Sequence, residues 1–274
     1  MKSIKELRQE KGVLVAAHRG TSAGNIPPNS IAAFDIALKE GADILEMDLF
    51  QSAEIFVFHT GMEPSHLDHH IKIETYTAAE IKQMRLCNCD LIETFLPVNT
   101  FDEVLEHLKG KCKMNLDRSI GIIEPVMKMV RRHGMEDQIL MKSDPSEQSL
   151  KLIEAYAPDI DYMPIFMEED HASEKIEKMK IHYAGAELVF KTEQSPIVQE
   201  AYLEEQKKKG RVLWGNAILY SSRVPLAGGH SDDISLLEDP AQGWGWLAQK
   251  GFDIIQTDWA MHCVNYLREN NYRK

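Results

Sequence analysis

Residues 13–50 read VLVAAHRGTSAGNIPPNSIAAFDIALKEGADILEMDLF, and this stretch holds two apolar, strand-like runs with a helix-like segment between them. The runs are 13–18 and 44–50, and the segment between them begins with a capping residue at Asn29 or Ser30. A helix between two apolar strands is typical of a crossover onto a parallel strand. The stretch therefore predicts the first unit of an α/β fold.

The same alternation continues along the rest of the chain. Six more apolar runs, each followed by a helix-like segment, lie at 113–117, 138–143, 161–166, 187–191, 211–217 and 252–257. Eight strand–helix units with right-handed crossovers predict a closed (β/α)8 barrel, the TIM-barrel fold, with a doubly wound open sheet as the alternative. No shift in composition suggests a linker, so we expect one domain over residues 1–274.

One extra apolar run interrupts this pattern. Residues 54–59 follow the second strand after a polar break that is too short for a crossover helix. We therefore expect this run to be a hairpin partner of that strand, within a small insertion of about 51–76. The segments 77–86 and 100–110 that come next are expected to be helical.

The charge balance narrows the class of partner. The chain has 31 Lys and Arg against 43 Asp and Glu, a net charge of -12, which argues against nucleic-acid binding. An anionic substrate remains compatible, because a local site can be positive on an acidic protein. The N-terminus lacks a signal-peptide pattern, and no apolar run approaches the roughly 18 residues of a spanning helix, so we expect no membrane insertion. The four cysteines are expected to be free thiols of a cytoplasmic protein, and the oligomeric state is left open.

Polar side chains mark the ends of the expected strands. In (β/α)8 barrels the chemistry lies at these ends. Here they carry His18, Arg19, His59, Asp117, Arg118, Lys142, Lys191, Asn216 and Asp258. We therefore expect the functional site at this end of the barrel.

Two acids within the second strand suggest a metal site. Glu46 and Asp48 are two residues apart, so they point to one face, roughly 6.5 Å apart along the strand. Two such carboxylates raise each other's pKa unless a cation neutralises them. A hard divalent cation, Mg²⁺ or Ca²⁺, fits oxygen ligands better than zinc does, and Asp117 would be the third ligand. The alternative is a salt-bridged barrel rim, with Arg19, Arg118 or Lys142 as the partner.

Two histidines differ from the other nine because each ends an apolar strand. His18 closes the first strand and His59 closes the hairpin strand. Two histidines beside a carboxylate-bound metal form a general acid/base pair around an anionic centre, which suits a phosphodiester. One would deprotonate the nucleophile and the other would protonate the leaving alkoxide, while Arg19 would neutralise phosphate oxygens.

Motifs over nearly the whole chain occur in one order, namely HRG at 18–20, PPNSIAAFDIALKEGADILEMDL, FVFH, YTAAEIKQMRL, FLPVNTFDEVLEHLKGKCKMNLD and GWGWLAQKGFDIIQTDWA. In these motifs the chain resembles the glycerophosphodiester phosphodiesterase family. The resemblance implies a (β/α)8 barrel with a small insertion beside the active site. It also implies that His18 and His59 are the acid/base pair and that Arg19 contacts phosphate. Glu46 and Asp48 are then the metal ligands.

The chain departs from the family pattern at several positions. Where the family usually has Glu, Asp, Glu and Lys, this sequence has Pro28, Thr60, Asp117 and Ser119. A shorter Asp still binds metal in a slightly rearranged site. The lysine's charge would be replaced by Arg118 or Lys142, although strand alternation predicts that Arg118 faces away from Asp117.

Two features near the C-terminus allow two interpretations each. Trp214, the counterpart of the family's tryptophan on strand 7, is either a wall that stacks on substrate or a core residue. The segment 227–240, acidic at Asp232 and Asp233, is either a solvated loop or a lid that contacts a polyol or a second cation.

The sequence as a whole predicts metal-dependent hydrolysis of a glycerophosphodiester, or a similar small phosphodiester, to an alcohol and a phosphomonoester. His18 and His59 would carry the chemistry, and Arg19, Lys142 and Trp214 would contact the substrate. The alternatives are phospholipase D-like cleavage of a lysolipid and a non-catalytic barrel that binds phosphate esters. Both direct attack by water and a cyclic phosphate intermediate fit the sequence.

Overall fold

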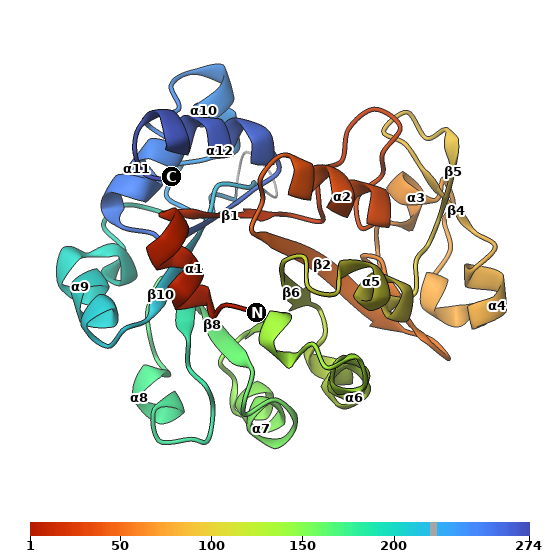
Figure 1. Ribbon diagram of the computed structural model, residues 1–274, viewed down its shortest axis with the longest axis horizontal. Helices are drawn as coiled ribbons and strands as arrows, with labels where there is room; N and C mark the ends of the chain where they lie inside the picture. The colour runs from red at the N-terminus through yellow and green to blue at the C-terminus, as the bar shows by residue number, and fades with distance from the viewer. Residues whose placement is uncertain (220–223) are drawn as a thin grey trace.

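The computed structural model describes residues 1–219 and 224–274, and it confirms the closed barrel (Figure 1). The barrel sheet runs in the order β1-β11-β10-β9-β8-β7-β6-β2, all parallel, and a pairing of β1 with β2 closes it. Its strands are β1 Leu14–Ala17, β2 Ile44–Gln51, β6 Lys113–Asp117, β7 Ile139–Ser143, β8 Asp161–Met167, β9 Gly185–Val189, β10 Val212–Asn216 and β11 Ile254–Thr257. The open doubly wound sheet is therefore wrong for this chain.

Helices surround the barrel on its outer side (Figure 1). They are α2 Ile31–Lys39, α5 Phe101–Leu108, α6 Ile123–His133, α7 Glu147–Tyr156, α8 Ser173–Ile176, α9 Glu200–Lys208, α11 Trp244–Lys250 and α12 Ala260–Glu269. The hydroxyl of Ser30 accepts from Ala33 N, so Ser30 is the cap of α2 and Asn29 is free for another contact. The main apolar core lies between the strands and these helices.

A second apolar cluster fills the inside of the barrel. Alternate residues of the strands contribute to it, among them Leu14, Ile44 and Trp214. A helix that was not predicted, α1 Ile4–Lys11, adds Ile4 to this cluster and lies across the barrel before β1 (Figure 1). The barrel is thus a packed core that is plugged at the end where its strands begin.

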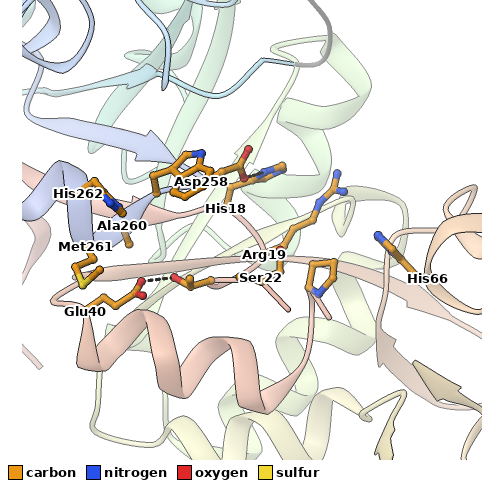
Figure 2. Close-up of a pocket in the computed structure, with 13 residues that line it drawn as sticks. His18, Arg19, Ser22, Glu40, His66, Asp258, Ala260, Met261 and His262 are labelled. Carbon is orange, nitrogen blue, oxygen red and sulfur yellow. Dashed lines mark hydrogen bonds and ion pairs between the residues drawn. The ribbon is translucent and has the colours of Figure 1, made fainter. Parts of the chain in front are cut away.

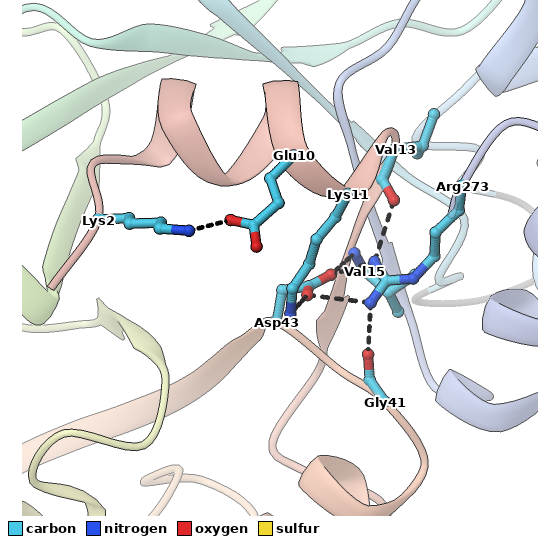
Figure 3. A network of polar contacts seen from close by, with 8 residues as sticks. All are labelled: Lys2, Glu10, Lys11, Val13, Val15, Gly41, Asp43 and Arg273. Carbon is cyan, nitrogen blue, oxygen red and sulfur yellow. Dashed lines mark hydrogen bonds and ion pairs between the residues drawn. The ribbon is translucent and has the colours of Figure 1, made fainter.

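A buried ion pair joins distant segments near the start of β1 and β2 (Figure 3). The Asp43 carboxylate accepts from Lys11 Nζ at 2.7 Å, from Val15 N at 2.9 Å and from both terminal nitrogens of Arg273. Arg273 also donates to the carbonyl of Gly41 at 2.9 Å. Because both Asp43 and Arg273 are buried, this contact fastens the C-terminus to the first barrel strands.

The extra strand pairs as predicted. β3 Ile55–Val57 runs antiparallel to β2, with Leu49 opposite Val57, and places His59 two residues beyond its end. Beyond β3 lie the short helix α3 Glu63–His66 and the turn η1 Ile73–Thr75.

The segment after residue 76 differs from the expected helix. Only α4 Ala78–Ile81 is helical there, and β4 Arg85–Cys87 then pairs antiparallel with β5 Glu93–Pro97. Leu86 is fully buried in a satellite cluster over the outer part of the β2–β3 hairpin. Tertiary packing of this apolar residue therefore overrides the local helical pattern, and the antiparallel pair lies beyond the predicted insertion of about 51–76.

Neither a membrane-spanning helix nor a disulfide occurs in the described part of the chain. The longest helix there, α6, has 11 residues, whereas a spanning helix needs roughly 20. All four cysteines are free, as predicted, and three of them are buried.

Candidate active site

The three predicted metal ligands lie together at the carboxyl end of two adjacent strands. β2 and β6 pair in register, with Asp48 opposite Asp117, and strand alternation places Glu46 on the same face as Asp48. One oxygen from each of the three carboxylates lies within 4.8 Å of the others. Glu46 and Asp48 are only 2% exposed, and Asp117 is half-buried.

The burial of these acids favours a cation between them. Desolvation and the nearby charge of Asp48 raise the pKa of Glu46 to about 8. Protein carboxylates that are buried and unpaired take up a proton instead of remaining charged. Three oxygen donors in one place are the ligand set that Mg²⁺ or Ca²⁺ prefers, so these residues fit such an ion.

The loop after β1 holds the acidic cluster in place. The backbone N–H of Arg19 donates to Glu46 at 2.9 Å, and the Asn29 amide donates to Asp48 at 2.9 Å. Both Arg19 and Asn29 have positive φ, at 57° and 55°. Such backbone conformations carry a cost and gather at functional sites. Asn29 was not among the predicted site residues, because it was considered only as a helix cap.

The salt-bridged rim, the alternative interpretation of these acids, is formed only in part. Arg19 Nε lies 2.9 Å from Asp48 Oδ2, but it makes no hydrogen bond with any residue that the structure describes, so the contact is an ion pair without hydrogen-bond geometry. Among the residues that the structure describes, neither Arg118 nor Lys142 is within ion-pair distance of Glu46 or Asp48. The cluster therefore keeps an excess of negative charge.

The first catalytic candidate, His18, is held by a carboxylate from the last strand (Figure 2). His18 Nδ1 lies 2.8 Å from Asp258 Oδ1, directly beyond β11. Burial opposes the charged imidazolium, but the hydrogen bond to Asp258 and the charge of Glu46 outweigh it and raise the pKa of His18. The Nδ1 contact leaves Nε2 of His18 for a substrate.

Asp258 is in turn positioned by Asp232, which is buried, so the solvated-loop interpretation is wrong at this residue, whereas Asp233 is exposed as that interpretation expects. Asp232 begins the short helix α10 Asp232–Leu237, and its side chain is 4% exposed. Its carboxylate accepts from Trp244 Nε1 at 2.7 Å, from Thr257 Oγ1 at 2.6 Å and from the backbone N–H of Asp258 at 2.9 Å. These bonds satisfy a buried acid, so it contacts neither solvent nor a lid ligand.

The second catalytic candidate, His59, is in a different electrostatic environment. Its Nδ1 is buried and has no hydrogen-bond partner in the described residues. Burial lowers the pKa of His59, and the charges of Arg19 and Arg118 lower it further, against the charge of Asp48. The two histidines therefore have pKa values shifted in opposite directions.

One cavity of about 320 Å³ brings most of the predicted residues together. It is lined by His18, Arg19, Asp48, His59, Asp117, Arg118, Lys142, Ile165, Glu187, Asn216, Ile218, Leu226 and Gln256. We call it the catalytic cavity. Lys191 is exposed and does not line it.

Lys142 lines the catalytic cavity but is nearly shielded from solvent, with only 5% of its surface exposed. Its Nζ donates to Glu187 at 2.6 Å and to Gln256 at 3.3 Å. The ammonium also lies 3.9 Å from the centre of the Trp214 ring. Trp214 itself is 0% exposed and does not line the cavity, which is against its predicted stacking on substrate. Its indole ring instead makes a cation–π contact with the Lys142 ammonium.

Arg118 and Ser119, which follow the third strand of the barrel, lie in opposite environments. Ser119 is buried and its hydroxyl donates to Leu116 O at 2.7 Å, so it does not reach the cavity. Arg118 does line the cavity, contrary to the face predicted from alternation, because its backbone has turned to a φ of 55°. Its guanidinium donates to Thr60 Oγ1 at 3.0 Å. Thr60 thus holds the arginine that brings positive charge to the site.

Known proteins share sequence and fold with most of this chain. The sequence model of the Glycerophosphoryl diester phosphodiesterase family matches residues 18–213, and that of a domain of unknown function matches residues 162–267. A glycerophosphodiester phosphodiesterase from Caldanaerobacter subterraneus is 27% identical over 62% of this chain and 74% of the relative. One from Bacillus altitudinis is 28% identical over 57% of this chain and 68% of the relative.

Solved structures show the same fold. A glycerophosphoryl diester phosphodiesterase from Parabacteroides distasonis superimposes with a TM-score of 0.81 at 18% identity, covering 98% of this chain and 93% of the other. A phosphodiesterase from Oleispira antarctica, solved with the product sn-glycerol-3-phosphate, superimposes with a TM-score of 0.67 at 20% identity over 97% and 100% of the two chains. With the family model matching more than half of its residues, the chain belongs to the glycerophosphoryl diester phosphodiesterase family and is a phosphoric diester hydrolase on a TIM barrel.

Proposed function

We propose that this protein hydrolyses a glycerophosphodiester, or a similar small phosphodiester, with the help of a divalent cation and a histidine pair. The observation that carries the proposal is one cavity lined by His18, His59 and two acids of a three-carboxylate cluster. A phosphate-binding barrel without catalysis would need the cationic side chains but not two histidines with opposite environments.

The histidine environments support distinct roles. His18 is bonded to Asp258 through Nδ1, so its Nε2 keeps a proton to donate to the leaving alkoxide as the ester bond breaks. His59 has a lowered pKa, stays neutral near pH 7 and accepts the proton of the attacking water. Pairs of titratable groups with pKa values pushed apart are typical of an acid and its base.

The charges of the catalytic cavity suit a phosphate. Arg19 and Arg118 bring guanidinium groups that bind phosphate oxygens, and Lys142 adds a buried ammonium. A divalent cation held by Glu46, Asp48 and Asp117 would supply further positive charge that stabilises the developing negative charge on phosphate.

The polar side of the catalytic cavity suits the glycerol arm. Glu187, Asn216 and Gln256 line it with both donors and acceptors, which hydroxyl groups need. A glycerol phosphate product bound to the Oleispira relative is consistent with a small polyol phosphate here. We further propose that the chain is a single domain and that it acts in the cytoplasm; its free, mostly buried thiols support the second of these proposals.

Cleavage of a lysolipid is the second candidate, because an apolar edge lies near the site. On the β4–β5 hairpin, Leu91, Ile92 and Phe95 are 44%, 63% and 85% exposed. Exposed apolar side chains of this kind can contact a lipid surface. Leu91 also lines a small cavity next to His66, at the side of the site.

The test is an assay of purified protein with glycerophosphodiesters and lysolipids, in Mg²⁺, in Ca²⁺ and in EDTA. We expect turnover of glycerophosphodiesters that EDTA abolishes and that is lost in His18→Ala and in His59→Ala. Turnover that continues in EDTA, or that survives both substitutions, would contradict the mechanism. Faster turnover of lysolipids would favour the second candidate, and binding of phosphate esters without turnover would favour a binding-only barrel.

A further inference from the structure

The Asp258 carboxylate, which holds His18, has few contacts of its own. Its side chain is 50% exposed, and in the described part of the chain it hydrogen-bonds only to His18 (Figure 2). A side chain with so few contacts can adopt several staggered rotamers, and each of them points the carboxylate in a different direction. The contact with His18 therefore depends on how the backbone of Asp258 is placed.

One buried carboxylate fixes the turn that carries Asp258. Asp232 accepts from the backbone N–H of Asp258 at 2.9 Å and from Thr257 Oγ1 at 2.6 Å. Because the hydroxyl proton of Thr257 is given to Asp232, the same oxygen is free to accept from the N–H of Trp259, at 2.9 Å. Asp232 thus holds Asp258 directly, and it holds the residues on either side of Asp258 through Thr257.

Asp232 is itself fixed by two other elements. Its backbone N–H donates to the carbonyl of Ala217, just beyond β10, at 2.7 Å, and its carboxylate accepts from Trp244 Nε1 of α11 at 2.7 Å. Asp232 is 4% exposed and Trp244 is 2% exposed. A buried carboxylate whose hydrogen bonds are satisfied in this way is a rigid support. Asp232 therefore ties the ends of β10 and β11 to α11.

We propose that Asp232 is a positioning residue for the proton that the leaving group receives. Through the turn after β11 it aims the Asp258 carboxylate at His18 Nδ1, which in turn directs Nε2 of His18 towards the leaving oxygen. This inference rests on the proposed function. Asp232 does not line the catalytic cavity, so its effect reaches the substrate only through Asp258 and His18.

The proposed reaction shows which step depends on Asp232. The water oxygen forms its bond to phosphorus and gives a proton to His59, while the bond from phosphorus to the alkoxide oxygen breaks. The proton on His18 Nε2 passes to that alkoxide. An alkyl alcohol is a poor leaving group without this proton, whereas p-nitrophenol is a much stronger acid and leaves as the anion. Loss of Asp232 should therefore slow the release of alkyl alcohols and have little effect on nitrophenolate.

The test compares two diesters of glycerol phosphate, glycerophosphoglycerol and the p-nitrophenyl ester, with kcat and KM measured for each. Asp232→Asn should lower kcat for glycerophosphoglycerol about 30-fold, because general acid catalysis contributes about 100-fold or more and a misdirected acid loses most of it. The same variant should lower kcat for the p-nitrophenyl ester less than about threefold, because that leaving group needs no proton. KM should change little for either diester, since the contacts to phosphate are intact.

Two further variants complete the comparison. Thr257→Val removes the hydroxyl that joins Asp232 to Trp259 and keeps a branched side chain in β11, so it tests the same turn if Asp232→Asn does not fold. It should show the same selective loss. Asp233→Asn, at the exposed next position of α10, is the matched control and should change neither rate.

Equal losses on the two diesters, or no loss on glycerophosphoglycerol, would overturn this inference while the hydrolysis itself stands. If wild type hydrolyses neither diester, the proposed function fails instead, and proton NMR of the ring N–H groups then decides the inference. A downfield Nδ1–H signal of His18, identified by its absence from His18→Ala, should be present in wild type and Asp233→Asn and absent from Asp232→Asn. Persistence of this signal in Asp232→Asn, or its absence from wild type, overturns the inference.

Discussion

Removing one buried charge from the acidic cluster should stabilise the protein in the absence of a cation. Glu46 is 2% exposed, beside Asp48, and desolvation and that neighbour raise its pKa from 4.5 to about 8. Between these two pH values the folded state holds a proton that the unfolded state has lost. Stability without a cation therefore falls as pH rises from about 4.5 towards 8.

The structure sets the size of this effect. At pH 8 the difference between the folded and unfolded pKa of Glu46 corresponds to about 4 kcal/mol of lost stability, as an upper value. Glu46→Gln cannot ionise and keeps an oxygen for the N–H of Arg19, but its amide adds two donors to the cluster. We therefore expect about half of the effect, about 2 kcal/mol, or a Tm about 4 °C higher for a chain of this size.

The assay is thermal unfolding of wild type and Glu46→Gln from pH 5 to pH 8, in EDTA and in Ca²⁺. In EDTA the Tm of the variant relative to that of wild type should rise with pH, because only the wild-type side chain at position 46 titrates. In Ca²⁺ the order should reverse, because a bound ion stabilises the wild type and the variant has lost a ligand. The control is Glu63→Gln, a glutamate 3% exposed and outside the cluster, which should leave the Ca²⁺ effect intact.

Two results would refute this reasoning. One is a Glu46→Gln protein that is less stable than wild type at pH 8 in EDTA, since the buried charge would then not be costly. The other is an equal rise of Tm with Ca²⁺ in both proteins, since Glu46 would then not be a ligand.

Three further substitutions test contacts around the candidate active site and the ion pair that joins the C-terminus to the barrel. Asp258→Asn should lower kcat about 100-fold and move the alkaline limb of the rate profile to lower pH, because His18 loses the acceptor that raises its pKa; a pH–rate series checks this. Arg273→Met should lower the free energy of unfolding by about 3 to 5 kcal/mol, measured by urea, because the buried Asp43 loses its partner. Lys142→Met should cost about 3 kcal/mol in the same assay, because a buried carboxylate loses its cation. A loss below about 1 kcal/mol in either of these two variants is the value for an exposed pair and would contradict the assigned burial.

The local sequence pattern was sufficient to predict those features of the protein that depend on residues close together in the chain. The period of two in β2 places Glu46 and Asp48 on one face whatever surrounds them. The short break before residue 54 permits only a hairpin, which carries His59 back to the site. Repetition of strand and helix units was enough to predict the closed barrel.

The hydrophobic pattern could not show which face of a parallel strand points into the barrel and which packs against the helices, because both faces are buried. Trp214 fits a cavity wall and a barrel interior equally well by sequence, and only its neighbours place it beneath Lys142. Arg118 follows strand alternation until a single left-handed residue turns it into the cavity. Leu86 lies in a separate apolar cluster, and the local helical pattern of residues 77–86 did not predict this packing.

The barrel, the hairpin and the residue types of the chemistry can be predicted from the amino-acid sequence, because they follow from short-range periodicity and from the residues that end each strand. Which of those residues touch depends on the folded chain. His18 and Asp258 are 240 positions apart, and they meet because closure of the barrel brings the first strand beside the last. A contact of that kind depends on the whole path of the chain, which no local pattern contains.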